Sequence, residues 1–174
     1  MTTNPMKVSE VKDQNILVDT NIVIYYAANG FKERSGNILR TLANNGNKIG
    51  ISEITAFELL HDEQKNEVED YFYKFVNYIH RVPVEQGCLQ NAVALAELYR
   101  VVCNNKKVPD NDLIIGGTAI HYDEVLLLTT DRKDFCEPLW DTYARDNIYY
   151  KEEGDVEVTL YLLRFNKEVI KLQK

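Results

Sequence analysis

Cysteine, proline and glycine are scarce in this chain, which has three, four and eight of them among its 174 residues. The low glycine and proline counts exclude a collagen-like or low-complexity protein. The three cysteines, at positions 88, 103 and 136, are odd in number and far apart. We therefore expect free thiols in a reducing, cytoplasmic location rather than a disulfide framework. Neither they nor the three scattered histidines show the spacing of a zinc site.

Long apolar runs and an excess of positive charge are also missing. No run approaches the length that spans a bilayer, and residues 1–15 lack the apolar core of a secretory signal, so we expect no membrane association. The net charge of −7 argues against a protein that holds nucleic acid on a broad basic face. It does not exclude a nuclease, because the carboxylates of a metal site add to the negative count.

The chain that remains has the composition of an ordinary globular protein, with 45% hydrophobic and 27% charged residues. Its length fits one domain over residues 1–174, with a core at about 16–135 and a C-terminal extension, 136–174, packed on the same domain.

Strand-like and helix-like segments alternate along the chain. We expect strands at about 15–19, 48–51, 81–84 and 125–130, and helices at about 21–29, 33–45, 53–61, 63–79, 86–103 and 112–121. A loop with short helical pieces should cover 132–145, and strands at 148–151 and 156–164 would form a hairpin that turns at Glu153-Gly154-Asp155. This order predicts an α/β fold whose central, mostly parallel sheet has helices on both faces and an antiparallel C-terminal edge. Gly116 and Gly117 predict that another element packs closely on their helix.

Two of the apolar strands end in a carboxylate, Asp19 and Asp131. Because ligands bind at the carboxyl ends of parallel strands, both side chains should reach one crevice. Glu58 follows the second strand, and Asp112 begins the helix that leads to the strand before Asp131. Four carboxylates in one crevice need a cation, and oxygen ligands suit Mg²⁺ or Mn²⁺. Metal-dependent phosphodiester hydrolysis is the chemistry that such a site supports.

Each acid also has an ordinary explanation when it is taken alone. Asp19 would be a turn residue, Glu58 a solvated helix residue and Asp112 a first-turn acid favoured by the helix dipole. Their joint pattern favours the site. The chain has no evident Ser/His/Asp set and no glycine-rich phosphate loop, so acyl-enzyme and nucleotide-loop chemistry have no support.

Four segments in order resemble the motifs of the PIN-domain ribonucleases, and most of all the VapC-type toxins of type II toxin–antitoxin pairs. They are Val18-Asp19-Thr20-Asn21, Ile54-Thr55-Ala56-Phe57-Glu58-Leu59, Asn111-Asp112-Leu113-Ile114-Ile115-Gly116 and Leu128-Thr129-Thr130-Asp131-Arg132-Lys133-Asp134-Phe135. The resemblance implies a Rossmann-like three-layer fold and an endoribonuclease that cuts single-stranded RNA with Mg²⁺ or Mn²⁺. It also implies a small antitoxin partner, and we expect a homodimer.

By position, the resemblance assigns metal binding and catalysis to Asp19, Glu58, Asp112 and Asp131. Supporting polar residues would be Asn21 and Thr130, together with Asp134, for which a capping role near Phe135 is the alternative. The basic residues that flank the site are the expected RNA contacts, with a solvated loop as an equal alternative. These are Lys106, Lys107, Arg132 and Lys133.

Other interpretations stay open. The chain would alternatively be a catalytically inactive PIN-like module that binds RNA or protein, or a PIN nuclease of RNA processing that is not a toxin. A phospho-acceptor receiver or a haloacid-dehalogenase-like phosphatase ranks lower, because that phosphatase expects a second Asp where this chain has Asn21. The apolar faces of 63–79 and 86–103 are either core or the contact surface of a second subunit or antitoxin.

Overall fold

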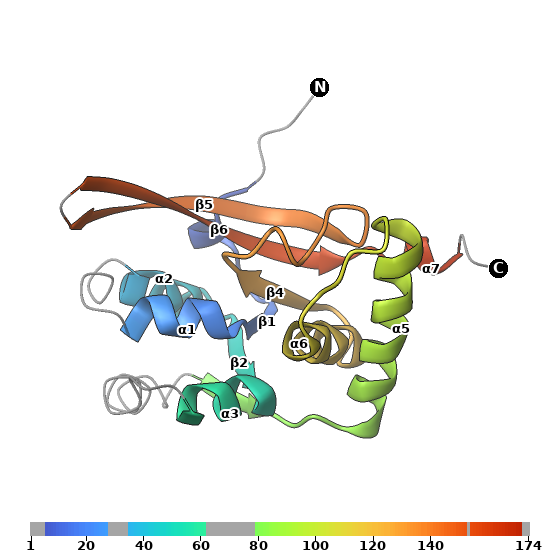
Figure 1. The fold of residues 1–174 in the computed structure, drawn as a ribbon. Coiled ribbons are helices and arrows are strands. Elements are labelled where there is room, and N and C mark those ends of the chain that lie inside the picture. Colours follow the sequence, from blue (N-terminus) through green and yellow to red (C-terminus); the bar gives the residue numbers. More distant parts are fainter. Residues whose placement is uncertain (1–5, 28–34, 62–78, 153, 172–174) are drawn as a thin grey trace.

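The computed structural model describes residues 6–27, 35–61, 79–152 and 154–171, and its centre is one six-stranded sheet (Figure 1). The strand order is β3-β2-β1-β4-β6-β5. Four strands are parallel, β6 runs antiparallel to β4, and β5 runs antiparallel to β6. The mostly parallel sheet and its antiparallel edge confirm the predicted fold class. The strand bounds are β1 (Asn15–Val18), β2 (Lys48–Ser52), β3 (Ile79–Val82), β4 (Val125–Thr129), β5 (Trp140–Glu152) and β6 (Gly154–Phe165).

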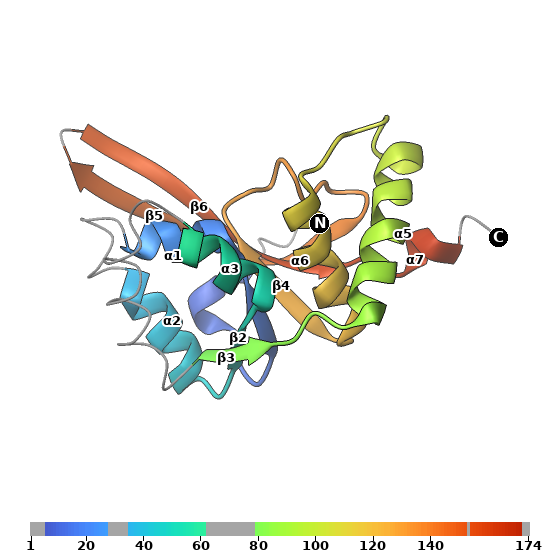
Figure 2. The same cartoon turned by 60° about the horizontal axis from the view of Figure 1, so that its bottom comes forward.

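Helices cover both faces of the sheet (Figures 1 and 2). In β4, Leu126 and Leu128 belong to one buried cluster and Leu127 to the other, because neighbouring strand residues face opposite sides. A strand buried on both faces is a continuous apolar run, which is why β1 and β4 were recognisable in the sequence. The helix bounds are α1 (Thr20–Ala27), α2 (Ser35–Asn44), α3 (Glu53–His61), α5 (Gln86–Val102), α6 (Asp110–His121) and α7 (Glu168–Lys171).

Most predicted elements agree with these bounds within a few residues, but two expectations differ. The helix predicted for 63–79 lies outside the described residues up to 78, and Ile79 already begins β3. The loop predicted for 132–145 is wrong beyond 139, because β5 begins at Trp140. Trp140 pairs with Phe165, which is distant in sequence, so local patterning gave no sign of this pairing. The predicted hairpin is confirmed, but Gly154 and Asp155, which were predicted in its turn, already pair with Glu152 and Lys151 as part of β6.

Helices α5 and α6 approach each other at backbone distance. A Cβ atom added to Gly117 would lie 2.4 Å from the Cys88 carbonyl oxygen and 2.7 Å from the Ala92 nitrogen. A Cβ on Gly116 would lie 2.7 Å from a methyl carbon of Leu95. Only glycine allows this approach, so the predicted close packing on the small-residue helix is confirmed. The contact positions α6, whose first turn carries Asp112.

One part of the helix predicted for 86–103 is core and another part is surface. Leu95, Leu98 and Tyr99 of α5 are buried against α6 and the sheet. Leu89 and Val93 are 46% and 74% exposed. Within the described ranges, no helix is both long and apolar enough to cross a membrane.

The β5–β6 hairpin extends past the end of β4, on the side of the molecule where α1 and α2 lie (Figures 1 and 2). The last pair between β4 and β6 joins Thr129 to Tyr161. From Leu160 back to Gly154, β6 continues with β5 alongside it. The outer edge of β5 is partly covered, because Met6 bridges Ala144 and its carbonyl oxygen accepts a hydrogen bond from the Arg145 N–H at 2.9 Å.

Candidate active site

Asp19 is the first residue after β1 and is 2% exposed. Its Oδ1 accepts a hydrogen bond from the Thr20 backbone N–H at 2.7 Å. Its Oδ2 accepts hydrogen bonds from Asn21 Nδ2 at 2.7 Å and from Thr129 Oγ1 at 2.6 Å. Neutral donors therefore fix this carboxylate at the carboxyl edge of the sheet, where the sequence predicted it.

The acids predicted for the site influence one another electrostatically. Burial, together with the negative charges of Asp19, Asp134, Asp131 and Glu58, raises the pKa of Asp112 to about 7. Charge effects of this kind require short separations, so the predicted carboxylates converge on the start of α6.

The pKa of Asp19 is raised to about 6, chiefly because burial penalises the charged carboxylate. The hydrogen bonds from Thr129 and the Thr20 backbone oppose this rise, and the charges of Glu58 and Asp131 add to it. Asp19 and Asp112 are thus two acids whose ionised forms are disfavoured by burial and by neighbouring negative charges.

Glu58 is held between two helix starts. Its Oε2 accepts a short hydrogen bond from Thr20 Oγ1, on the first residue of α1. Its Oε1 accepts a hydrogen bond from Asn111 Nδ2, in the first turn of α6, at 2.6 Å. Helix α3, which carries Glu58, begins at a true cap, because Ser52 Oγ accepts the Thr55 N–H at 3.1 Å.

Asp131 lies two residues beyond β4 and organises the loop that follows. Its backbone N–H donates to Thr129 Oγ1 at 2.9 Å, and its Oδ1 accepts the Asp134 N–H at 2.9 Å. The Asp134 carboxylate pairs with Lys106 Nζ at 3.4 Å. Asp134 therefore contributes a charge near Asp112 and also closes the turn that begins at Asp131.

The sequence predicts Thr130 among the supporting residues and does not indicate Thr129, whose side chain makes the contacts. The Thr129 hydroxyl donates to Asp19 and accepts from Asn21 Nδ2 and the Asp131 N–H. Thr130 takes part through its backbone N–H, which donates to Asn21 Oδ1 at 3.3 Å. The available signal was position, because Thr129 is the last residue of the apolar strand and the carboxyl ends of parallel strands meet at one edge of the sheet.

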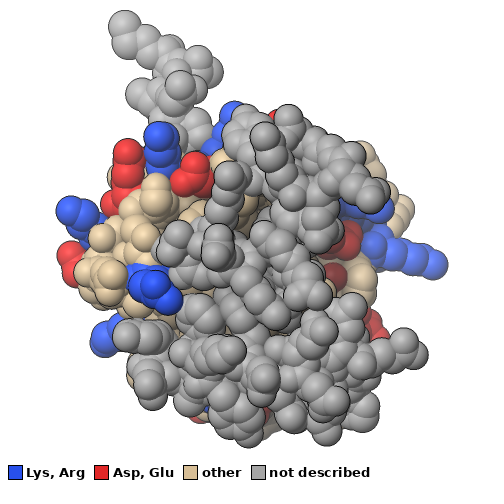
Figure 3. All heavy atoms as spheres, turned by 90° about the vertical axis from the view of Figure 1, so that its left-hand side faces the viewer, with Lys and Arg blue, Asp and Glu red and all other residues tan. Residues whose placement is uncertain are grey.

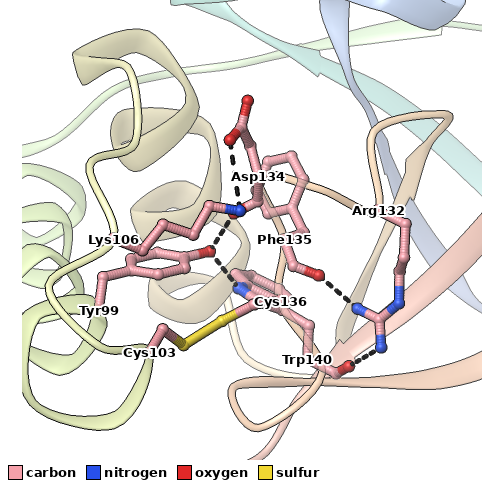
Figure 4. Close-up of a disulfide and its surroundings, with 8 residues drawn as sticks. All are labelled: Tyr99, Cys103, Lys106, Arg132, Asp134, Phe135, Cys136 and Trp140. Carbon is pink, nitrogen blue, oxygen red and sulfur yellow. Dashed lines mark hydrogen bonds and ion pairs between the residues drawn. A yellow bond between two sulfur atoms is a disulfide. The ribbon is translucent and has the colours of Figure 1, made fainter.

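The four basic residues predicted to contact RNA have different surroundings. The Arg132 guanidinium donates to the carbonyl oxygens of Phe135 and Trp140, the latter at 2.7 Å, and closes the loop after Asp131 (Figure 4). Lys106 is paired with Asp134. Lys107 and Lys133 are exposed. RNA contact by any of the four stays a prediction.

Cys103 and Cys136 form a disulfide, so the expectation of free thiols is wrong for these two residues (Figure 4). Cys88 is the free, buried cysteine. The bridge joins the end of α5 to the loop that carries Asp131, across 33 residues of sequence. The sequence alone did not show that these two segments lie side by side.

Two consecutive hydrogen bonds through the buried Tyr99 hydroxyl also hold the loop that carries Asp131. Trp140 Nε1 donates to Tyr99 Oη at 3.0 Å, and Tyr99 Oη donates to the Asp134 carbonyl oxygen at 2.7 Å (Figure 4). Tyr99 is 1% exposed, and burial raises its pKa well above the usual value, so its hydroxyl stays a proton donor. Helix α5 therefore anchors the loop of Asp131 through a hydroxyl, a disulfide and the nearby Lys106.

The chemistry of the site suits a hard divalent cation, since its acids offer only oxygen donors. In the part of the chain that the structure describes, however, no three His, Cys, Asp or Glu side chains already form a closed set of metal ligands. The carboxylates of Asp19 and Glu58 instead accept hydrogen bonds from Thr20, Asn21, Asn111 and Thr129.

Comparisons with known proteins identify the family and agree with the fold. The family model described as the PIN domain matches residues 16–138. A chain in the crystal structure of VapBC2 from Rickettsia felis, bound to a promoter DNA fragment, is 24% identical with a TM-score of 0.59. The match covers 69% of this chain and 90% of that one. No curated protein matches the chain significantly.

Two further solved structures are similar. A toxin–antitoxin complex from Klebsiella pneumoniae contains a chain that is 25% identical with a TM-score of 0.52, and the match covers 70% of this chain and 91% of that one. DNA-bound VapBC from Salmonella typhimurium gives 19% identity and a TM-score of 0.55, over 70% of this chain and 90% of that one. Each neighbour is covered almost completely, whereas about a third of this chain has no counterpart in the match.

Proposed function

Because this chain belongs to the PIN domain family, we propose that it is a metal-dependent endoribonuclease that hydrolyses phosphodiester bonds of single-stranded RNA. The observation that carries the proposal is the convergence on Asp112, whose pKa is raised to about 7 by burial and by four other carboxylates. Raised carboxylate pKa values that arise from neighbouring carboxylates are typical of functional sites.

The proposed metal ligands are Asp19, Glu58, Asp112 and Asp131, and Mg²⁺ or Mn²⁺ is the proposed cofactor. When bound, such an ion activates water and stabilises negative charge on the phosphate. The chain's own residues prepare the ligands: Asn21 and Thr129 orient Asp19 through the hydrogen bonds to its Oδ2. Thr20 and Asn111 orient Glu58 in the same way.

We propose that the biological role is that of a VapC-like toxin held inactive by a small antitoxin. Support comes from the solved structures that resemble the chain, which are VapBC or toxin–antitoxin complexes. We also propose that residues 1–174 form one domain, since β6 of the C-terminal segment pairs with β4 of the core. The homodimer and the cytoplasmic location stay predictions.

The second candidate is a catalytically inactive PIN-like module that binds RNA or protein. The observation that favours it is the absence, among the described residues, of three side chains already arranged as metal ligands. Titration calorimetry with Mn²⁺ separates the two candidates, because the inactive module binds no metal at this site. A phosphatase of the haloacid-dehalogenase type has less support, since the Asn21 amide is a hydrogen-bond donor to Asp19 and offers no second acid.

The decisive experiment is cleavage of a mixed single-stranded RNA by the purified protein with Mg²⁺, with Mn²⁺ and with EDTA. The Asp19→Asn variant should lose cleavage. Asp141→Asn should keep it, because Asp141 is an exposed acid at the start of β5, away from the carboxyl ends of β1 and β4. Cleavage that needs both metal and Asp19 supports the proposal. Cleavage by Asp19→Asn at the parent rate would show that the site is wrong.

A further inference from the structure

Three residues form one cross-strand row that begins in the site. Thr129 of β4 pairs with Tyr161 of β6, and Tyr161 pairs with Arg145 of β5. Directly paired residues on neighbouring strands point to the same face. The neighbouring pair fixes that face, because Leu127 and Leu163 both belong to the cluster packed under α5 and α6. The row Thr129–Tyr161–Arg145 therefore lies on the side of the sheet that also carries Asp112.

The row leads outward from the catalytic acids at a short distance. Thr129 is hydrogen-bonded to Asp19 and to the backbone of Asp131. Neighbouring strands are about 4.8 Å apart, so the Arg145 backbone lies roughly 10 Å from that of Thr129. A nucleic-acid strand bound at the acids would therefore also be within reach of the Arg145 side chain.

The outer two residues of the row are partly or fully accessible. Tyr161 is half-buried and Arg145 is exposed. In the part of the chain that the structure describes, the Arg145 guanidinium has no ion-pair partner. The opposite face of the hairpin is occupied, because Ile148, Leu160 and Leu162 pack there in the other buried cluster.

Cations for the substrate phosphates are scarce near the site. Arg132 is bound to two backbone carbonyls and Lys106 is paired with Asp134. Figure 3 views the end of the molecule toward which the hairpin projects. The described side chains visible there mix both signs of charge and form no broad basic surface. Lys107 and Lys133 are exposed in the loops around the site, and Arg145 adds an exposed guanidinium in the same cross-strand row as the Tyr161 ring.

We propose that Arg145 and Tyr161 bind the RNA strand beside the cleavage position, with the guanidinium on a phosphate and the ring stacked on a base. Stacking on aromatic side chains and contact of basic residues with phosphate are how proteins hold single strands. This inference rests on the proposed nuclease function and gives that site a substrate-binding surface. The hairpin lies beyond the family match, which ends at residue 138, so the surface belongs to this chain rather than to the shared core.

The test measures binding of a fluorescent single-stranded RNA to the uncut complex, using the Asp19→Asn protein as background. Arg145→Ala should weaken binding about tenfold and reduce the slope of log affinity against log salt by about 0.7, the value for one lost phosphate contact on a single strand. Tyr161→Leu should weaken binding similarly, and Tyr161→Phe should bind as the parent does because it keeps the ring.

A matched control is available on the same hairpin. Arg164 lies over the Tyr143 ring on the opposite face, with its guanidinium carbon 4.5 Å from the ring centroid. Arg164→Ala removes the same charge and should leave RNA binding unchanged. Equal loss in Arg145→Ala and Arg164→Ala would reduce the effect to net charge and overturn the proposal.

Cleavage kinetics separate this inference from the proposed function. In the otherwise unaltered protein, Arg145→Ala should raise KM about tenfold with kcat retained, because the residue holds substrate without taking part in the reaction. If the parent protein cuts no RNA but the Arg145 effect on binding persists, the nuclease proposal fails, whereas RNA binding by Arg145 and Tyr161 is supported. If Arg145→Ala and the parent bind RNA equally, or neither binds it, the inference is overturned.

Discussion

Thr129 Oγ1 lies 2.6 Å from Asp19 Oδ2 and donates a hydrogen bond to it. The same hydroxyl accepts the Asp131 N–H, so one side chain connects the Asp19 carboxylate to the backbone of Asp131. Its position on β4 next to β1 makes this possible, because Val18 and Leu128 are paired just before the two chains diverge.

Thr129→Val should therefore lower nuclease activity without unfolding the protein. The change keeps the β-branched shape and removes a hydrogen bond to a charged group, a contribution of about 1.5–3 kcal/mol, so kcat should fall by roughly tenfold to a hundredfold. Thr129→Ser keeps the hydroxyl and is the control. The measurement is cleavage of a defined RNA at saturating metal, with circular dichroism to check the fold. Parent-level kcat in Thr129→Val would contradict the role.

Stability should depend on pH through Asp19 and Asp112 when no metal is bound. Both carboxyl pKa values are raised, to about 6 and about 7. The folded state therefore holds protons that the unfolded state has released above its ordinary value of about 3.9. The stabilising contribution is complete below that value and is lost as the pH rises through about 6 to 7.

Thermal unfolding in EDTA between pH 4 and pH 8 measures this effect. The comparison is between the parent and the Asp19→Asn/Asp112→Asn double variant, which removes both titrations. The parent should lose more stability than the variant across pH 5 to 7, and added Mn²⁺ should reduce the difference. Identical pH profiles would mean that the two acids titrate normally.

Removing Asn111 should impair the site through Glu58. Asn111 Nδ2 donates to Glu58 Oε1 at 2.6 Å from an exposed position. Asn111→Ala should lower kcat by about twofold to tenfold, less than the loss of a buried hydrogen bond to a carboxylate, because water can replace the donor at this exposed position. Asn111→Asp should cost more, because it adds a negative charge beside Glu58. An Asn111→Asp protein as active as Asn111→Ala would contradict the contact.

The disulfide makes a prediction that needs no substrate. Under denaturing conditions without reductant, the protein should show one reactive thiol, that of Cys88, and three after reduction. Cys103→Ser/Cys136→Ser should lose about 3–4 kcal/mol of unfolding free energy, the chain-entropy expectation for a loop of this size. Cys88→Ser in the oxidised protein serves as the control for substitution itself. Three thiols in the unreduced protein would show that the bridge does not form.

The sequence predicted Asp19 and Asp131 because the signal is local: an apolar run buried on both faces cannot continue through an ionised side chain. Asp112 was harder to place, since its position depends on how α6 packs. The close contact of Gly117 with Cys88 and Ala92 of α5 determines that position. The residues of 110–121 alone do not indicate which element α6 packs against.

Other features depended on partners that are distant in sequence. The sequence predicts a free thiol at Cys136, because its partner Cys103 follows α5 and comes close to the loop after β4 only in the fold. Trp140 looked like part of a loop because its strand partner, Phe165, comes 25 residues later. Thr129 looked like an ordinary strand residue, since threonine is common in strands. Its importance comes from the two carboxylates beside it.

The contact between α5 and α6 at Gly116 and Gly117 also sets a limit on how this molecule can change. Because a Cβ on Gly117 would meet the Cys88 carbonyl oxygen and the Ala92 backbone of α5, a larger residue at Gly117 would push the two helices apart. The helix start that carries Asp112 would move with them, and the alignment of the acids would be lost. The space available to a side chain at Gly117 is thus tied to the position of Asp112, in the first turn of the same helix.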